Sequence, residues 1–271
     1  MIKISGNSNY KVSVIDNKNQ FYIVKESFTK DESQRLKKQI EKQENFIDTV
    51  IYKPDIIDKK ESKYIFEYIR SYDMINYLNV KSIYHIFDYV DKILSFIHRE
   101  IKESIVQEID VKILQTKINT IEKNLLNFRK EKIIESCFRY LRENLFIFRN
   151  EIPIGRCHGD LTFSNILIDY GDQIYFIDFL DNFIESPLFD IIKIRQDIVY
   201  GYIFQTYKGT YDKHRLSMIF DFMNERMNRE FGDYKMYFRY LDIMNFLRIL
   251  QYSKNDHMDG YIINVLSDIL S

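Results

Sequence analysis

The sequence predicts an α+β fold, with a small β-rich N-terminal part followed by a larger helical part. Strand-prone runs at residues 11–16, 21–24 and 64–69 are separated by turn residues within the first 70 positions. After about residue 72, apolar side chains recur at spacings of three and four, which is the period of an amphipathic helix. Residues 156–179 return to short strands around a loop. The 271 residues therefore divide into parts 1–70 and 71–271.

The N-terminal part begins with antiparallel strands. Residues 11–16 alternate in character, residues 17–20 supply a turn, and residues 21–24 form an apolar run. A helix is expected over 33–46, with Thr29 or Asp31 as its N-cap. Residues 50–57, interrupted by a proline, are expected to neighbour the strand 64–69.

Composition and charge exclude several classes of protein. Apolar residues make up 45% of the chain and charged residues 29%, which is ordinary for a globular enzyme. The net charge of -1 provides no strong field for nucleic acid, so no nucleic-acid partner is expected. No apolar run approaches the ~18 residues of a membrane span, and the N-terminus lacks the apolar segment of a secretory signal. With only two cysteines and no metal-binding spacing, a cytoplasmic location is expected, while the oligomeric state stays open.

The candidate catalytic and metal-binding residues lie in the segment 157–179. Two apolar strands flank Tyr170-Gly171-Asp172, which predicts a hairpin. The hairpin brings the loop before its first strand close to the end of its second, so Asp160, Asn165 and Asp178 are expected to converge. An amide oxygen and a carboxylate suit Mg²⁺, and a second carboxylate can orient an attacking hydroxyl in phosphoryl transfer. The alternative is a turn in which these side chains only cap the backbone.

The same residues resemble a known family. His158-x-Asp160-x4-Asn165, followed by Asp178-Phe179, is similar to the catalytic loop and metal-binding motif of the aminoglycoside phosphotransferase and choline kinase family of the protein-kinase-like superfamily. The resemblance implies a protein-kinase-like bilobal fold, with a nucleotide-binding lobe at 1–70 and a catalytic and acceptor-binding lobe at 71–271. It implies ATP and Mg as cofactors, Asp160 as the catalytic base, and Asn165 and Asp178 as metal ligands. His158 would brace the metal-binding loop.

The resemblance extends to the N-terminal lobe. Lys25 follows a strand where this superfamily places its phosphate-binding lysine. The expected partner is a glutamate on the next helix, Glu41 or, one turn away, Glu44. Either glutamate could equally be an ordinary surface carboxylate.

Two backbone segments complete the expected nucleotide site. Ser5 and Gly6 lie between the first two strands, where backbone N–H groups could cover phosphates, although an ordinary hairpin turn explains them as well. Glu67 to Ile69 occupies the place of the hinge, whose backbone would pair with adenine. A plain strand end is the alternative there.

The sequence thus predicts an ATP- and Mg-dependent phosphotransferase acting on a hydroxyl of a small molecule. A sugar or surface-polysaccharide precursor is the first expectation for the acceptor, because the phrase His-Gly-Asp-Leu-Thr-x-Ser-Asn-Ile-Leu resembles phosphotransferases found among such genes. The alternatives are a nucleotide-binding pseudokinase scaffold and a protein kinase. Leu180 in place of glycine after Asp178-Phe179, and the absence of an Ala-Pro-Glu motif, disfavour the protein kinase.

Overall fold

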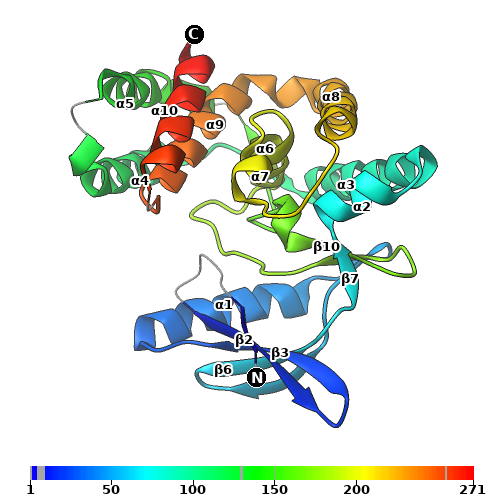
Figure 1. Ribbon diagram of the computed structural model, residues 1–271. Helices are drawn as coiled ribbons and strands as arrows, with labels where there is room; N and C mark the ends of the chain where they lie inside the picture. The colour runs from blue at the N-terminus through cyan, green and yellow to red at the C-terminus, as the bar shows by residue number, and fades with distance from the viewer. Residues whose placement is uncertain (1, 5–9, 129–130, 150, 254) are drawn as a thin grey trace. The chain divides into compact units, whose positions relative to one another are not determined.

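The chain forms two compact units. A computed structural model describes residues 2–4, 10–128, 131–149, 151–253 and 255–271 (Figure 1). Unit 1 comprises Met1–Lys92 and His158–Asn182, and unit 2 comprises Ile93–Cys157 and Phe183–Ser271. The whole of the predicted catalytic hairpin therefore packs with the N-terminal residues. The lobes expected at 1–70 and 71–271 divide the chain by function, whereas these units divide it by packing. The functional division stays a prediction.

Unit 1 contains a five-stranded antiparallel sheet. Its strand order is β1-β2-β3-β6-β5, with bounds β1 Ile2–Ile4, β2 Lys11–Asn17, β3 Gln20–Glu26, β6 Lys63–Glu67 and β5 Ile56–Lys60. Lys18 and Asn19, in the turn between β2 and β3, have φ values of 54° and 67°. Positive φ at both central residues matches the twist of a tight hairpin, so the predicted turn is confirmed.

Helix α1 (Lys30–Asn45) lies along this sheet (Figure 1). Thr29 is its N-cap, and a reciprocal pair of hydrogen bonds between Thr29 and Glu32 forms a capping box. Leu36 and Ile40 are buried against Tyr64 and Phe66 of β6. This packing fixes the face that α1 turns toward β3 and β6.

A second, four-stranded sheet in unit 1 has the order β4-β11-β10-β7, with bounds β4 Ile51–Tyr52, β11 Ile174–Phe176, β10 Ile166–Asp169 and β7 Ser71–Asp73. The predicted hairpin is confirmed as β10 and β11. Residues 50–57 behave differently from the expectation, because they divide into two strands. Strand β5 does neighbour β6, but β4 pairs in parallel with β11.

Helix α2 (Met74–Val80) follows β7, and α3 (Ile83–Glu103) follows α2. Met74, Ile75, Tyr77 and Leu78 of α2 are buried. The division between the two units falls within α3.

Unit 2 is mainly helical. Its other elements are β8 Ile105–Gln107, α4 Val111–Asn124, η1 Leu126–Phe128, α5 Lys132–Glu143, η2 Leu145–Arg149, β9 Ile152–Ile154, α6 Pro187–Ile198, α7 Tyr202–Thr206, α8 Lys213–Glu230, η4 Gly232–Tyr234, α9 Lys235–Leu250 and α10 Asp256–Leu270. Helices α6 and α9 form the centre, since most of their side chains are buried. The predicted α+β class, β-rich at the start and helical at the end, is confirmed. In the parts of the chain that are described, no helix combines the length and apolarity needed to cross a membrane.

The centre of unit 2 holds a buried ion pair. Arg195 of α6 donates from Nη2 to Asp242 Oδ2 of α9 at 3.0 Å, and the Tyr200 hydroxyl donates to the same oxygen at 2.7 Å. The side chain of Asp242 is almost fully enclosed. Burial raises the pKa of the Asp242 carboxyl, while the Arg195 charge opposes that shift.

Candidate active site

The loop predicted to be catalytic is built around His158. Its side chain is fully buried, and its ring centroid lies 4.5 Å from that of Phe179. The Asp160 backbone N–H donates to Nδ1 at 3.2 Å, so Nε2 must carry the proton of the neutral ring. Nε2 then donates to the Ile177 carbonyl at 2.8 Å. His158 thus braces the end of β11 against the loop that holds Asp160.

Burial also sets the protonation state of this ring. Loss of hydration lowers the pKa of His158 to about 4, although the negative charge of Asp160 opposes the shift. The imidazole is therefore neutral near neutral pH. A neutral, buried ring with both nitrogens engaged is suited to holding backbone in place rather than to proton transfer.

Asp160 and Asn165 meet within the same loop. The Asn165 amide nitrogen donates to the Asp160 carbonyl at 2.7 Å and to Asp160 Oδ2 at 3.1 Å. With this assignment of the amide, the Asn165 oxygen accepts no hydrogen bond from the described residues. That oxygen remains available to a cation, while the nitrogen orients the Asp160 carboxylate.

Asp178 and Lys25 form the second half of the site. Lys25 Nζ lies 3.2 Å from Asp178 Oδ1, although 153 residues separate them in sequence. The lysine side chain is nearly buried, whereas the Asp178 side chain is 57% exposed. Asp178 has a φ of 58°, in the left-handed region that aspartate tolerates better than most residues. Its other carboxylate oxygen has no hydrogen-bond partner among the described residues.

Gly159 allows the two segments to approach closely. Its φ is 89°, and an added Cβ would collide with the Leu180 carbonyl. The Leu180 N–H donates to the His158 carbonyl at 3.1 Å, and the Asn182 amide donates to the Gly159 carbonyl at 3.2 Å. The loop of Asp160 and the segment after Asp178 therefore lie against each other, backbone to backbone.

The partner predicted for Lys25 is wrong. Lys25 Nζ donates to Gln39 Oε1 at 3.4 Å, and it also lies 4.8 Å from the centre of the Tyr10 ring. Glu41 is exposed and pairs with Lys37. The alternative, Glu44, pairs with Lys59. The reason is the direction in which each side chain points around the axis of α1.

Leu36 and Ile40 fix the buried face of α1, and Gln39 shares that face. Glu41 lies one residue beyond Ile40, about 100° further around the helix, and it points to solvent. Gln39 is a residue of the site that the sequence reasoning missed. Its position three residues after Leu36 was the available signal.

The other predicted nucleotide-binding residues are less defined. Ser5 and Gly6 lie outside the described residues. Glu67 ends β6, and its backbone N–H donates to the Asp55 carbonyl at 2.9 Å. The Ile69 carbonyl accepts from the Ser71 hydroxyl at 3.4 Å. The nucleotide hinge at Glu67 and Ile69 stays a prediction.

The donor set fits a magnesium ion. Within the described ranges, no cluster of three or more His, Cys, Asp or Glu side chains could hold a metal. The predicted ligands are instead one amide oxygen and one carboxylate, those of Asn165 and Asp178. Magnesium commonly takes few protein ligands and completes its shell with water and phosphate.

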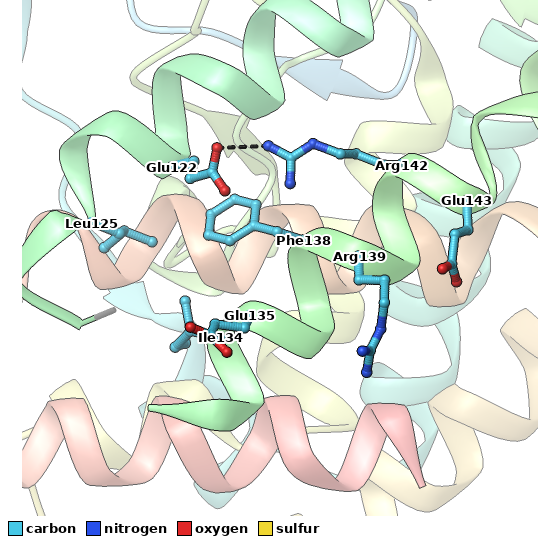
Figure 2. Close-up of a pocket in the computed structure, with 8 residues that line it drawn as sticks. All are labelled: Glu122, Leu125, Ile134, Glu135, Phe138, Arg139, Arg142 and Glu143. Atoms are coloured by element: carbon cyan, nitrogen blue, oxygen red, sulfur yellow. Dashed lines mark hydrogen bonds and ion pairs between the residues drawn. The ribbon is translucent and has the colours of Figure 1, made fainter. Parts of the chain in front are cut away.

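A separate cavity in unit 2 contains none of these residues. It lies between α4 and α5, has a volume of about 600 Å³, and includes Phe138 and the ion pair between Glu122 and Arg142 at 2.6 Å (Figure 2). It carries no arrangement of groups suited to phosphoryl transfer.

Comparisons with known proteins support the family resemblance. The model of the phosphotransferase enzyme family matches residues 114–220, which include the whole of the segment from His158 to Asp178. The resemblance predicted from the sequence is confirmed. No curated protein sequence matches the chain.

Solved structures of two aminoglycoside phosphotransferases and a choline kinase share the fold. A thermostable mutant of aminoglycoside phosphotransferase APH(4)-Ia has a TM-score of 0.65 at 10% identity, covering 99% of this chain and 93% of that one. The streptomycin–ATP complex of APH(2")-IIa has a TM-score of 0.56 at 16% identity, covering 98% and 90%. Choline kinase LicA from Streptococcus pneumoniae has a TM-score of 0.56 at 15% identity, covering 98% and 91%. The protein-kinase-like fold is therefore established over nearly the whole chain.

Proposed function

We propose that this protein is an ATP- and magnesium-dependent phosphotransferase that acts on a hydroxyl group of a small molecule. The observation that carries the proposal is the assembly in unit 1. Asp160 and Asn165 lie in one loop, and Asp178 forms an ion pair with Lys25, which comes from the distant strand β3. Phosphoryl transfer depends mainly on positioning and on charge stabilisation, and these four side chains supply both.

The proposed roles follow from the contacts. Asp160, oriented by the Asn165 amide, accepts the proton of the attacking hydroxyl. Lys25 is a nearly buried cation on β3 that binds phosphate oxygens of the nucleotide. Asn165 and Asp178 would hold magnesium, which when bound neutralises negative charge on the phosphates. Backbone groups from Glu67 to Ile69 would contact adenine, and Ser5 and Gly6 would cover the phosphates.

The acceptor is proposed as a hydroxylated metabolite. One similar structure is a complex with streptomycin and ATP, and another is a choline kinase. These similarities support a small hydroxylated acceptor as a class. A sugar or surface-polysaccharide precursor is our first candidate within that class. We expect the reaction to take place in the cytoplasm, where ATP is available.

A screen for phosphorylated product tests the proposal. The protein is incubated with ATP, magnesium and separate pools of sugars, aminoglycosides and choline, and the small molecules are analysed by mass spectrometry. We expect one pool to gain a phosphorylated compound with the wild-type protein and to gain none with Asp178→Asn. Nucleotide binding without ADP formation in any pool would favour a pseudokinase scaffold. Phosphate appearing only on protein would favour a protein kinase.

A further inference from the structure

Helix α1 contacts the segment that follows Asp178 directly. Lys42 Nζ donates to the Leu180 carbonyl at 2.7 Å, and Arg35 Nε lies 4.0 Å from Asp181 Oδ1. Residues 35 and 42 are two helical turns apart, so both side chains project from the same side of α1. Arg35 is more than half exposed, whereas the Lys42 contact is partly buried. The Lys42 contact is therefore the stronger of the two.

Leu180 is held at both of its backbone polar groups. Its N–H donates to the His158 carbonyl, and its C=O accepts from Lys42. The catalytic loop holds one side of the residue and α1 holds the other. Two residues earlier, Asp178 adopts a left-handed backbone conformation. Such a conformation costs free energy for a residue other than glycine, so the contacts of the segment must hold it in place.

We propose that Lys42 is a positioning residue for the metal-binding segment, and that it fixes Asp178 through its hydrogen bond to the Leu180 carbonyl. The expected effect on metal–nucleotide binding rests on the proposed function, because Asp178 is a proposed magnesium ligand. Gln39, which accepts the hydrogen bond from Lys25, is neutral. This contact is therefore not an ion pair between α1 and the site. The charge-assisted bond from Lys42 supplies a direct link between α1 and the segment instead. Loss of this bond should weaken metal–nucleotide binding more than it slows the chemical step.

The matched variants keep the helix intact. Lys42→Met retains the length of the apolar stem and removes the donor, while Lys42→Arg retains a charged donor. Lys42→Leu is a second variant without a donor, in case the methionine variant does not fold, and the same results are expected of it. Lys37→Met is the control, because Lys37 lies on the same helix, is largely exposed and pairs with Glu41.

Hydrogen–deuterium exchange of the protein without nucleotide tests the positioning itself. Lys42→Met should speed exchange at residues 178–182 on the order of tenfold, the effect of losing one charge-assisted hydrogen bond. Lys42→Arg and Lys37→Met should match the wild type. Equal exchange in Lys42→Met and wild type would overturn the proposal. So would an increase spread evenly over unit 1, because it would mark Lys42 as a general stabiliser.

Binding of Mn²⁺ with a non-hydrolysable ATP analogue, followed by electron paramagnetic resonance, tests the consequence. We expect the affinity to fall about tenfold in Lys42→Met and to be restored in Lys42→Arg. Unchanged affinity in Lys42→Met would overturn the inference. If the wild type bound no Mn²⁺–nucleotide, the proposed function would fail, and the exchange result alone would decide whether Lys42 positions the segment.

Discussion

Acidification should destabilise this protein through one histidine. His158 is fully buried and neutral, and its pKa is about 4 in the folded state against an ordinary value of 6.5. Because the folded pKa is lowered, the unfolded chain binds more protons as the pH falls, so stability is present above about 6.5 and is lost toward about 4. Between about pH 7 and about pH 5, this single group should remove about 2 kcal/mol from the free energy of unfolding.

Urea unfolding of wild type, His158→Gln and His98→Gln at the two pH values measures the effect. His158→Gln should be less stable at neutral pH, because it loses ring packing against Phe179, but its stability should depend less on pH by about 2 kcal/mol. His98→Gln, whose ring is exposed, should keep the wild-type pH dependence. Equal losses in wild type and His158→Gln would refute the reasoning, since they would place the titration elsewhere.

Three further substitutions have expected outcomes. Gly159→Ala should abolish ATP turnover while circular dichroism shows retained helix, because the added methyl group collides with the Leu180 carbonyl. Asp242→Asn should lower the free energy of unfolding by about 3 kcal/mol in chemical denaturation, because it leaves the Arg195 charge buried without its partner. Leu161→Ala should cost about 3 kcal/mol in the same assay, because the side chain is fully buried; a cost below about 1 kcal/mol would contradict that packing.

The hairpin of β10 and β11 could be predicted because its information is local. Asp160, Asn165 and Asp178 lie within one short stretch, and turn residues between two apolar runs fix how the stretch folds. Thr29 was predictable for the same reason, since a capping residue acts within one helical turn. Contacts of this kind need no knowledge of the rest of the molecule.

The contacts of α1 were harder to predict because they depend on the phase of the helix and on long-range packing. Glu41 was chosen by its charge, while the buried positions Leu36 and Ile40 already placed Gln39 on the inner face. The bond from Lys42 joins residues 138 positions apart and ends on a backbone carbonyl, which leaves no trace in the sequence. The parallel pairing of β4 with β11 was missed for a similar reason, because β4 has only two residues.

The most direct test of the proposed role of Asp160 is the transfer of a radiolabelled γ-phosphate from ATP by Asp160→Asn. We expect a rate lower by about a hundredfold or more with nucleotide binding retained, because the amide is isosteric but cannot accept the proton of the hydroxyl. Asp58→Asn, a change of a half-exposed side chain on β5, should transfer phosphate at the wild-type rate. Transfer by Asp160→Asn at the wild-type rate would contradict the assignment of Asp160 as the catalytic base.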